Sequence, residues 1–234
     1  MPTPEIPLTM NIPVRIKMPR VFRYMDAQYI DQFFDTGALR LGSFARFRGY
    51  PDEVRGDPSE GQGIVVTKGG NNGIYNMVTS LGHDAYVFCT SLESSPRIRE
   101  QFGNQSSFVI NDPLAFAMTV ARSVPGITGA ILGFCNYQEQ RVIEKVNASL
   151  TGNEMFSADG AFQLSAATLG AVYSKTVGTG LDLLFLKHMN YQSQAEFRFI
   201  WTVASQFNTV TEFLDISCRE AVQFCARVEG DRAA

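Results

Sequence analysis

The segment Gln194-Ala195-Glu196-Phe197-Arg198-Phe199-Ile200-Trp201 alternates polar and apolar side chains late in the chain. Successive side chains of a β-strand point to opposite faces, so Gln194, Glu196 and Arg198 share one face and the aromatic residues share the other. We therefore expect a half-buried strand over 195–203 whose apolar face joins the core. The polar row must face water, a partner or a ligand, because burying unpaired polar groups costs free energy.

The composition predicts a single cytoplasmic domain of ordinary size. The chain has 234 residues, of which 45% are hydrophobic, and a net charge of −3. This is enough apolar material for a core, and the acidic balance argues against a general nucleic-acid binder. The four cysteines are widely spread and form no metal-ligand cluster, so we expect reduced thiols and no metal site. Neither a secretory signal nor a membrane-spanning apolar run is expected.

Helices and strands are mixed without regular alternation, which predicts an α+β fold. A proline-rich arm over residues 1–19 is expected to precede one α+β domain over residues 20–230. Strands are expected at 20–25, 64–67, 85–92, 107–110, 127–137, 195–203 and 209–214. Helices are expected at 27–36, 113–123, 138–150 and 164–175, and a last one is expected to begin at Ser217, which has capping-box spacing to Glu220.

Three further segments carry residues suited to chemistry. Arg23 stands between aromatic residues on a short strand and could grip a phosphate or carboxylate, or be an ordinary surface arginine. The strand 86–92 ends in the hydroxyls of Thr90 and Ser91, which suit either a ligand or simple turn formation. The acidic loop 52–61 could hold a metal or form a substrate rim, although a solvated loop cross-linked by Arg55 fits its residue order better.

Taken in order, Arg23, Cys89-Thr90-Ser91 and Gln194-Ala195-Glu196 resemble the arginine, serine-threonine-serine and glutamine-x-glutamate signature of ADP-ribosyltransferases. Tyr191 also lies where that family has an aromatic residue ahead of its catalytic glutamate. The sequence departs from the pattern at Cys89, where the first serine usually stands, and at Tyr24, where a smaller residue is common.

The resemblance implies a mixed or antiparallel sheet split around a cleft with flanking helices, and NAD as substrate. Glu196 would stabilise positive charge developing on the nicotinamide ribose, Ser91 would orient Glu196, and Gln194 would face the acceptor. Arg23 would bind an NAD phosphate or ribose. The resemblance places Tyr24, Thr90 and Tyr191 at the NAD site. The macromolecular acceptor, protein or nucleic acid, stays open.

A second resemblance covers more of the chain and concerns a large bacterial family of uncharacterised proteins. That family has an Asn-Asp-Pro-x-Glu motif and a late Glu-x-Arg strand. The matching residues are Tyr24, 37–40, Asp57-Pro58-Ser59-Glu60, 88–91, Lys187 and Glu196-Phe197-Arg198, with Gly56 in place of the asparagine. This resemblance bears on architecture and not on chemistry.

Two alternatives to a transferase stay open at this point. The first is a non-enzymatic interaction or sensor domain of a phage or of a phage-defence system, in which the same residues form a structural ion-pair network without an adjacent pocket. The second is a metal-dependent nuclease built from Asp52, Asp57, Glu60, Glu196 and Lys187. The histidines show no nucleophile-base arrangement for a hydrolase triad.

Overall fold

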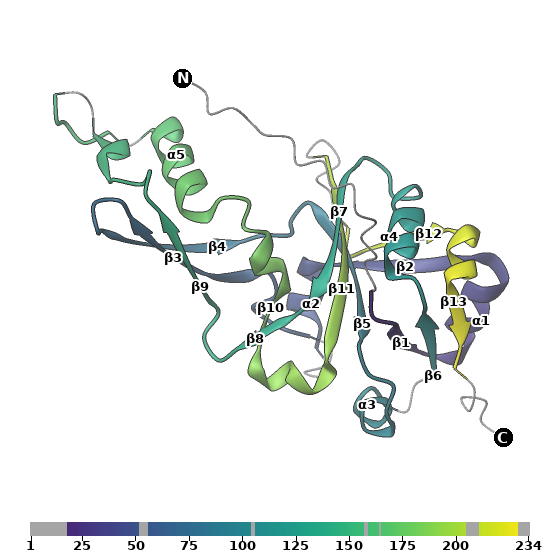
Figure 1. Cartoon of the computed structure of the whole chain (residues 1–234). Helices are drawn as coiled ribbons and strands as arrows, with labels where there is room; N and C mark the ends of the chain where they lie inside the picture. The colour runs from purple at the N-terminus through teal and green to yellow at the C-terminus, as the bar shows by residue number, and fades with distance from the viewer. Residues whose placement is uncertain are drawn as a thin grey trace, which may run out of the picture.

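An antiparallel eight-stranded sheet forms the centre of the chain in a computed structural model that describes residues 18–51, 56–103, 106–156, 159–163, 165–204 and 211–228. Most of its strands follow the order β12-β2-β5-β1-β6-β13, and β11 pairs with both β5 and β7. Figure 1 shows this sheet with helices around it, which makes the protein α+β. The strands are β1 (Val21–Met25), β2 (Ala38–Ser43), β5 (Ala85–Ser91), β6 (Ser106–Ile110), β7 (Ile127–Phe134), β11 (Glu196–Val203), β12 (Phe213–Ser217) and β13 (Cys225–Arg227).

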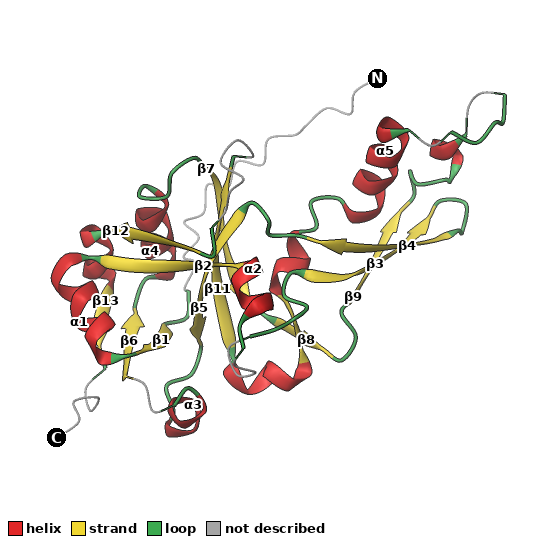
Figure 2. Cartoon of the chain, turned by 180° about the vertical axis from the view of Figure 1, so that it is seen from behind, coloured by secondary structure: helices red, strands yellow, loops and turns green. Residues whose placement is uncertain are grey.

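A smaller three-stranded sheet lies to one side of the main sheet, as both cartoon views show (Figures 1 and 2). It consists of β4 (Ile74–Ser80), β3 (Gln62–Gly69) and β9 (Val142–Asn147), and α5 (Ala166–Val177) packs against it. The short strands β8 (Asn136–Gln138) and β10 (Leu186–His188) pair in parallel. The other helices are α1 (Ala27–Thr36), α2 (Phe44–Gly49), α3 (Pro96–Gln101) and α4 (Pro113–Ala121), with 3-10 turns η1 (Asn153–Met155), η2 (Leu181–Phe185), η3 (Met189–Gln194) and η5 (Arg219–Phe224).

The main core is aromatic and lies between the sheet and helices α1 and α4. Phe199 on β11 is fully buried and contacts the rings of Phe88, Phe116, Phe197 and Trp201. These ring contacts hold helix α4 against strands β5 and β11 of the main sheet. The apolar face expected for the 194–201 segment is therefore confirmed.

Local signals in the sequence set several element ends. Gly37 ends α1 with φ of 75°, a backbone conformation that glycine adopts without a steric penalty, and donates to the Phe33 carbonyl. The Asp112 carboxylate accepts from the backbone N–H of Ala115 at the start of α4. These two helices are confirmed, as is the strand predicted at 20–25.

Several expectations are wrong. The acidic loop is not solvated at Asp57 and Glu60, which are each 3% exposed. Residues 138–150 are not a helix, because β-branched residues such as Val142 and Ile143 pair as β9 with the neighbouring β3. Ser217 does not begin an α-helix: its hydroxyl donates to the Thr36 carbonyl, and a 3-10 turn begins at Arg219. The strand expected at 195–203 is not half-buried, because both faces of β11 are covered.

Several predicted features lie outside the described residues: positions 1–17 of the arm, and Asp52 and Arg55 of the acidic loop. Across the described ranges, no helix combines the length and the apolar character needed to cross a membrane.

Replacing Phe199 with alanine tests the packing of the aromatic core. We expect Phe199→Ala to lower the free energy of unfolding by about 3–5 kcal/mol, because the large cavity left among four rings cannot close fully. The matched control is Leu169→Ala on α5, where a 48% exposed side chain should cost less than about 0.5 kcal/mol. Urea unfolding of both variants measures the difference, and equal losses would contradict the described core.

Candidate active site

The main sheet splits along one edge of β5. At the start of β5, Val87 pairs with Gly42 of β2, and at its end Ser91 pairs with Phe22 of β1. Between these two points neither strand pairs with β5 in the described structure. The Arg23 guanidinium occupies part of the split, donating from Nη1 to the Cys89 carbonyl at 2.6 Å. An arginine thus satisfies a backbone group that a neighbouring strand would otherwise satisfy.

A cavity of about 570 Å³ opens along this split. That volume lies within the usual range for small-molecule sites. Its more exposed part is lined by aromatic and basic side chains of β1, β2 and α2. Its buried part is lined by charged and polar side chains of β5, β10, η3, β11 and the acidic loop. The residues of this buried, inner part are Glu60, Cys89, Thr90, Ser91, Lys187, Gln194 and Glu196.

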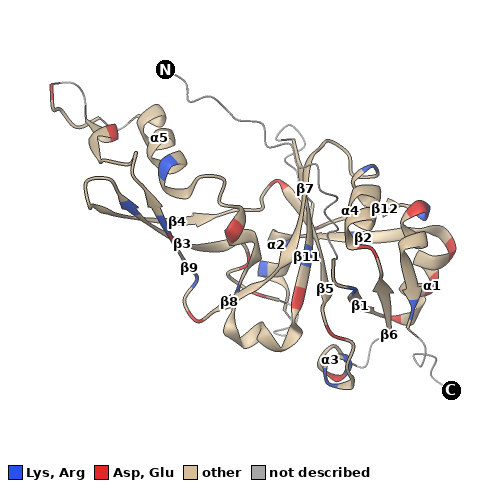
Figure 3. Cartoon of the chain, in the orientation of Figure 1, with Lys and Arg blue, Asp and Glu red and all other residues tan. Residues whose placement is uncertain are grey.

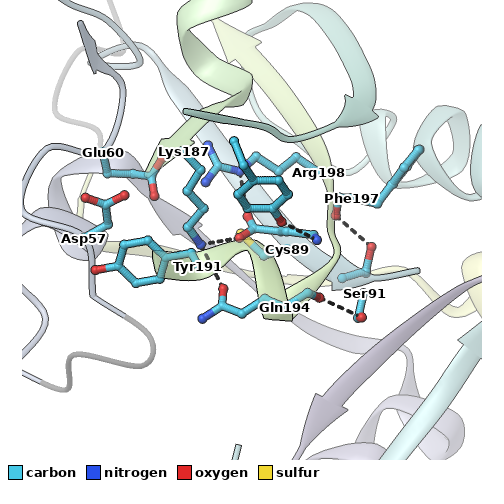
Figure 4. A network of polar contacts seen from close by, with 12 residues as sticks. Asp57, Glu60, Cys89, Ser91, Lys187, Tyr191, Gln194, Phe197 and Arg198 are labelled. Carbon is cyan, nitrogen blue, oxygen red and sulfur yellow. Dashed lines mark hydrogen bonds and ion pairs between the residues drawn. The ribbon is translucent and has the colours of Figure 1, made fainter. Parts of the chain in front are cut away.

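A buried cluster of charges forms the inner end of the cavity (Figure 4). The two carboxylate oxygens of Glu196 have different partners: Oε1 accepts from Arg198 Nε at 2.6 Å, and Oε2 accepts from Lys187 Nζ. Arg198 also donates to the Leu184 carbonyl at 2.5 Å and forms an ion pair of 2.7 Å with Glu60. Figure 3 shows the acidic and basic residues of β11 at the centre of the molecule. The polar row of β11 is therefore internally paired, not exposed to water.

Burial and pairing oppose each other in setting the charge of this cluster. Burial alone would raise the pKa of Glu196, but Arg198 and Lys187 outweigh it and hold that pKa well below its usual range. Burial would lower the pKa of Lys187, but Glu196 and Glu60 outweigh it and raise that pKa. The cluster thus contains two basic side chains, Lys187 and Arg198, and two acidic ones, Glu60 and Glu196.

The loop that carries Glu60 is fixed from several directions. Asp57 forms a buried ion pair with Arg141, whose Nη1 donates to the Ser59 carbonyl at 2.6 Å. Tyr191 donates its hydroxyl proton to the Gly56 carbonyl at 2.7 Å, and its ring lies 4.8 Å from Lys187 Nζ. These contacts fix the loop that contains the Asp-Pro-Ser-Glu motif, so that Glu60 is held against Arg198.

The hydroxyls at the end of β5 fix the entry into β11. Ser91 Oγ donates to the Gln194 carbonyl at 2.8 Å, and Thr90 Oγ1 donates to the Phe197 carbonyl at 2.8 Å. Ser91 also lies opposite Glu196 in the strand register. Ser91 therefore positions Glu196 through the backbone, and the carboxylate itself is oriented by Lys187 and Arg198.

The structure brings nearly all of the expected site residues together. Glu196, Gln194, Ser91, Thr90, Arg23 and Tyr24 all line the one cavity. Tyr191 is not among its lining residues and contacts the cluster through Lys187. Gln194 is 4% exposed, and its Oε1 accepts from Lys187 Nζ at 3.0 Å.

Some residues of the site were not expected from the sequence. Arg141 holds the acidic loop, and the Tyr137 hydroxyl accepts from the backbone N–H of Glu196 at 2.6 Å. Both lie in the segment for which a helix and a long strand were expected, so no local pattern marked them. The sequence did single out Lys187 and Glu60, because both are among the residues that match the uncharacterised bacterial family with the Asn-Asp-Pro-x-Glu motif.

Carboxylates of the suggested nuclease centre are paired with cations. Asp57 lies against Arg141, Glu60 against Arg198, and Glu196 against both Lys187 and Arg198. Within the described ranges, no group of three or more His, Cys, Asp or Glu side chains is arranged to hold a metal ion. Comparisons with protein-family models, with curated proteins and with solved structures gave no match to this chain.

Neutralising Lys187 tests whether the buried charges depend on one another. We expect Lys187→Met to lower the free energy of unfolding by about 3–5 kcal/mol, because two buried carboxylates then share one arginine. Adding Glu60→Gln restores the balance of one anion and one cation, so the double variant should be more stable than the sum of the two single effects predicts. Urea unfolding of the four proteins gives the coupling energy, and simple additivity would contradict the cluster.

Cys89 lines the cavity but should be a poor nucleophile. Burial, and next the charge of Glu196, raise the pKa of its thiol, so the thiol stays protonated at neutral pH. We expect little carbamidomethylation of Cys89 by iodoacetamide in the folded protein at pH 7.5, and modification of all four cysteines in guanidinium chloride. Peptide mass spectrometry measures both, and rapid labelling of Cys89 in the folded state would contradict this environment.

Proposed function

We propose that the protein cleaves NAD and transfers its ADP-ribose group to an acceptor. The observation that carries this proposal is that Arg23, Ser91 and Glu196, which lie far apart in the sequence, line one cavity. The split in the main sheet along β5 also agrees with the cleft that the resemblance to ADP-ribosyltransferases implies.

The chemistry required is stabilisation of a cationic sugar. When the bond between nicotinamide and the ribose C1′ breaks, the electron pair leaves with nicotinamide and positive charge develops on the ribose. A nucleophilic group of the acceptor then forms the new bond to C1′ and loses its proton to solvent. A carboxylate fixed in advance at that point lowers the barrier without having to reorganise. Glu196 suits this role because Lys187 and Arg198 keep it ionised and oriented. We assign Arg23, Tyr24 and Thr90 to the nucleotide, and Gln194 to the side of the acceptor.

The ion pairs of the Glu196 carboxylate favour a second function, that of a sensor domain that binds a nucleotide without cleaving it. Both oxygens of Glu196 already accept hydrogen bonds from cations, and its side chain is 4% exposed. In a sensor domain the cluster would then only support the cavity, and the nucleotide would bind without being cleaved. Turnover separates the two functions.

Removing the carboxylate charge tests the proposed reaction. We expect Glu196→Gln to reduce NAD cleavage by roughly 10²–10³-fold, the usual effect of losing one preorganised electrostatic contact. The assay follows nicotinamide release and label transfer from NAD to cell extract, with Arg122→Ala, an exposed residue outside the cavity, as control.

Because Glu196→Gln can also destabilise the fold, Ser91→Ala serves as a second variant. It removes the hydrogen bond that Ser91 Oγ donates to the Gln194 carbonyl and the one it accepts from the Glu93 backbone N–H, but it leaves the side chains of the charge cluster in place. We therefore expect a smaller loss of kcat than for Glu196→Gln and a loss of about 1–3 kcal/mol in the free energy of unfolding. Full activity of Glu196→Gln would exclude its proposed role, and binding of NAD without any release of nicotinamide would favour the sensor.

The dependence of activity on pH follows from the low pKa of Glu196. A lowered pKa means that the carboxylate stays ionised as pH falls through the usual glutamate range, so kcat/KM should not decline between pH 8 and pH 5 through protonation of Glu196. Lys187→Met removes one of the two cations, so a decline at acid pH should appear at higher pH in this variant than in the wild type. Identical profiles for the two proteins would contradict a direct effect of Lys187 on Glu196.

A further inference from the structure

Besides Arg198 of the charge cluster, four arginines lie at or beside the cavity, and three of these four already have strong partners. Arg23 donates to the Cys89 carbonyl and lies over the Phe88 ring. Arg40 forms two hydrogen bonds, of 2.6 and 2.7 Å, to the carboxylate of Asp215. Arg48 donates to the Glu60 carbonyl at 2.9 Å.

Arg46 is different. It lines the cavity from α2, and no carboxylate of the described residues lies within ion-pair distance of it. Its guanidinium lies 5.4 Å from the ring centroids of both Tyr50 and Phe213. Aromatic faces stabilise a cation without neutralising its charge, and they leave the edge of the guanidinium available to an anion.

Asp215 is an acidic neighbour of Arg46, but its carboxylate does not cancel this charge. Its carboxylate is held by both arms of the Arg40 fork, and the pKa of Asp215 is lowered chiefly by that hydrogen bond, with a smaller contribution from Arg46. The other lining carboxylates are Asp26 at the mouth and the paired Glu60 and Glu196 at the inner end. Arg46 therefore supplies net positive charge to the more exposed part of the cavity.

We propose that Arg46 is the anchor for the diphosphate group of the ligand. A guanidinium binds two phosphate oxygens through parallel N–H donors, and its effect is strengthened in a cavity partly closed to water. With the phosphates at Arg46, the rest of a dinucleotide would reach Gln194 and Glu196, which line the same cavity. This inference rests on the proposed function only in that the ligand is a nucleotide diphosphate, because anchoring does not require turnover.

Isothermal titration calorimetry with ADP-ribose, ADP, inorganic pyrophosphate and adenosine tests the anchor. The wild type should bind the three phosphate compounds and bind adenosine far more weakly. Arg46→Ala should weaken ADP-ribose and ADP about 10- to 100-fold, as expected for loss of a charge-assisted contact, and Arg46→Lys should lie in between. Arg122→Ala, an exposed arginine outside the cavity, is the matched control and should change nothing.

Asp215→Asn is expected to change the affinity for ADP-ribose in the opposite direction from Arg46→Ala. It removes a negative charge and releases Arg40 from its carboxylate, so ADP-ribose binding should tighten several-fold. Affinity within twofold of wild type for Arg46→Ala, equal affinity for adenosine and ADP, or no binding of any phosphate compound would each overturn the anchor.

The two proposals can fail separately. If the wild type binds ADP-ribose through Arg46 but releases no nicotinamide from NAD, the anchor stands and the transferase fails. If Arg46→Ala cleaves NAD with unchanged KM, the transferase stands and the anchor fails.

Discussion

The Arg198 guanidinium is the interaction on which the rest of the site depends. It lies 1% exposed in the middle of the central strand β11, where an uncompensated charge would cost several kcal/mol. Glu196 on the same strand, Glu60 from the acidic loop and the Leu184 carbonyl together satisfy it. Glu196 is two residues away on β11, but Glu60 comes from a loop far earlier in the chain and Leu184 from the 3-10 turn before β10. Folding of the centre therefore requires that the acidic loop and the segment around Leu184 reach their final positions.

This requirement explains why the inner end of the cavity is both charged and rigid. Glu60 can reach Arg198 only because Arg141 and Tyr191 hold its loop from outside. Lys187 then pairs with the second carboxylate, so that the cluster contains two basic and two acidic side chains. Buried ion pairs of this kind are weak evidence for stability, but they specify one arrangement, because any other pairing leaves a charge unmatched. The cavity consequently has a fixed polar end and a more open aromatic mouth.

The sequence predicted the strand alternation and α1, because both depend on local spacing. That Arg23, Ser91 and Glu196 belong to one site was implied only by the resemblance to ADP-ribosyltransferases, and the residues themselves left open whether they share a cleft. The sequence did not predict that the polar row of β11 is buried. Alternation shows that Glu196 and Arg198 share a face, but what covers that face comes from Glu60 and Lys187, whose contacts depend on the tertiary fold. The segment 138–150 was mispredicted for the same reason: its residues suit a helix or a strand, and pairing with β3 decides between them. Arg46 had no distinguishing pattern, since its importance follows from the pairing of the arginines around it.

Under the proposed function, Gln194 would also have a role that differs from contact with an acceptor. If Glu196 is to bind a ribose hydroxyl, one of its two cations must yield, because both carboxylate oxygens are occupied. Arg198 cannot move without breaking its contacts to Glu60 and to the Leu184 carbonyl. Lys187 has a second acceptor already in place, the Gln194 Oε1 at 3.0 Å, and the Tyr191 ring beside it. An ammonium group can shift between such neighbours with little loss of solvation, so Lys187 is the partner that a ligand would displace, and Gln194 is the residue that would retain it.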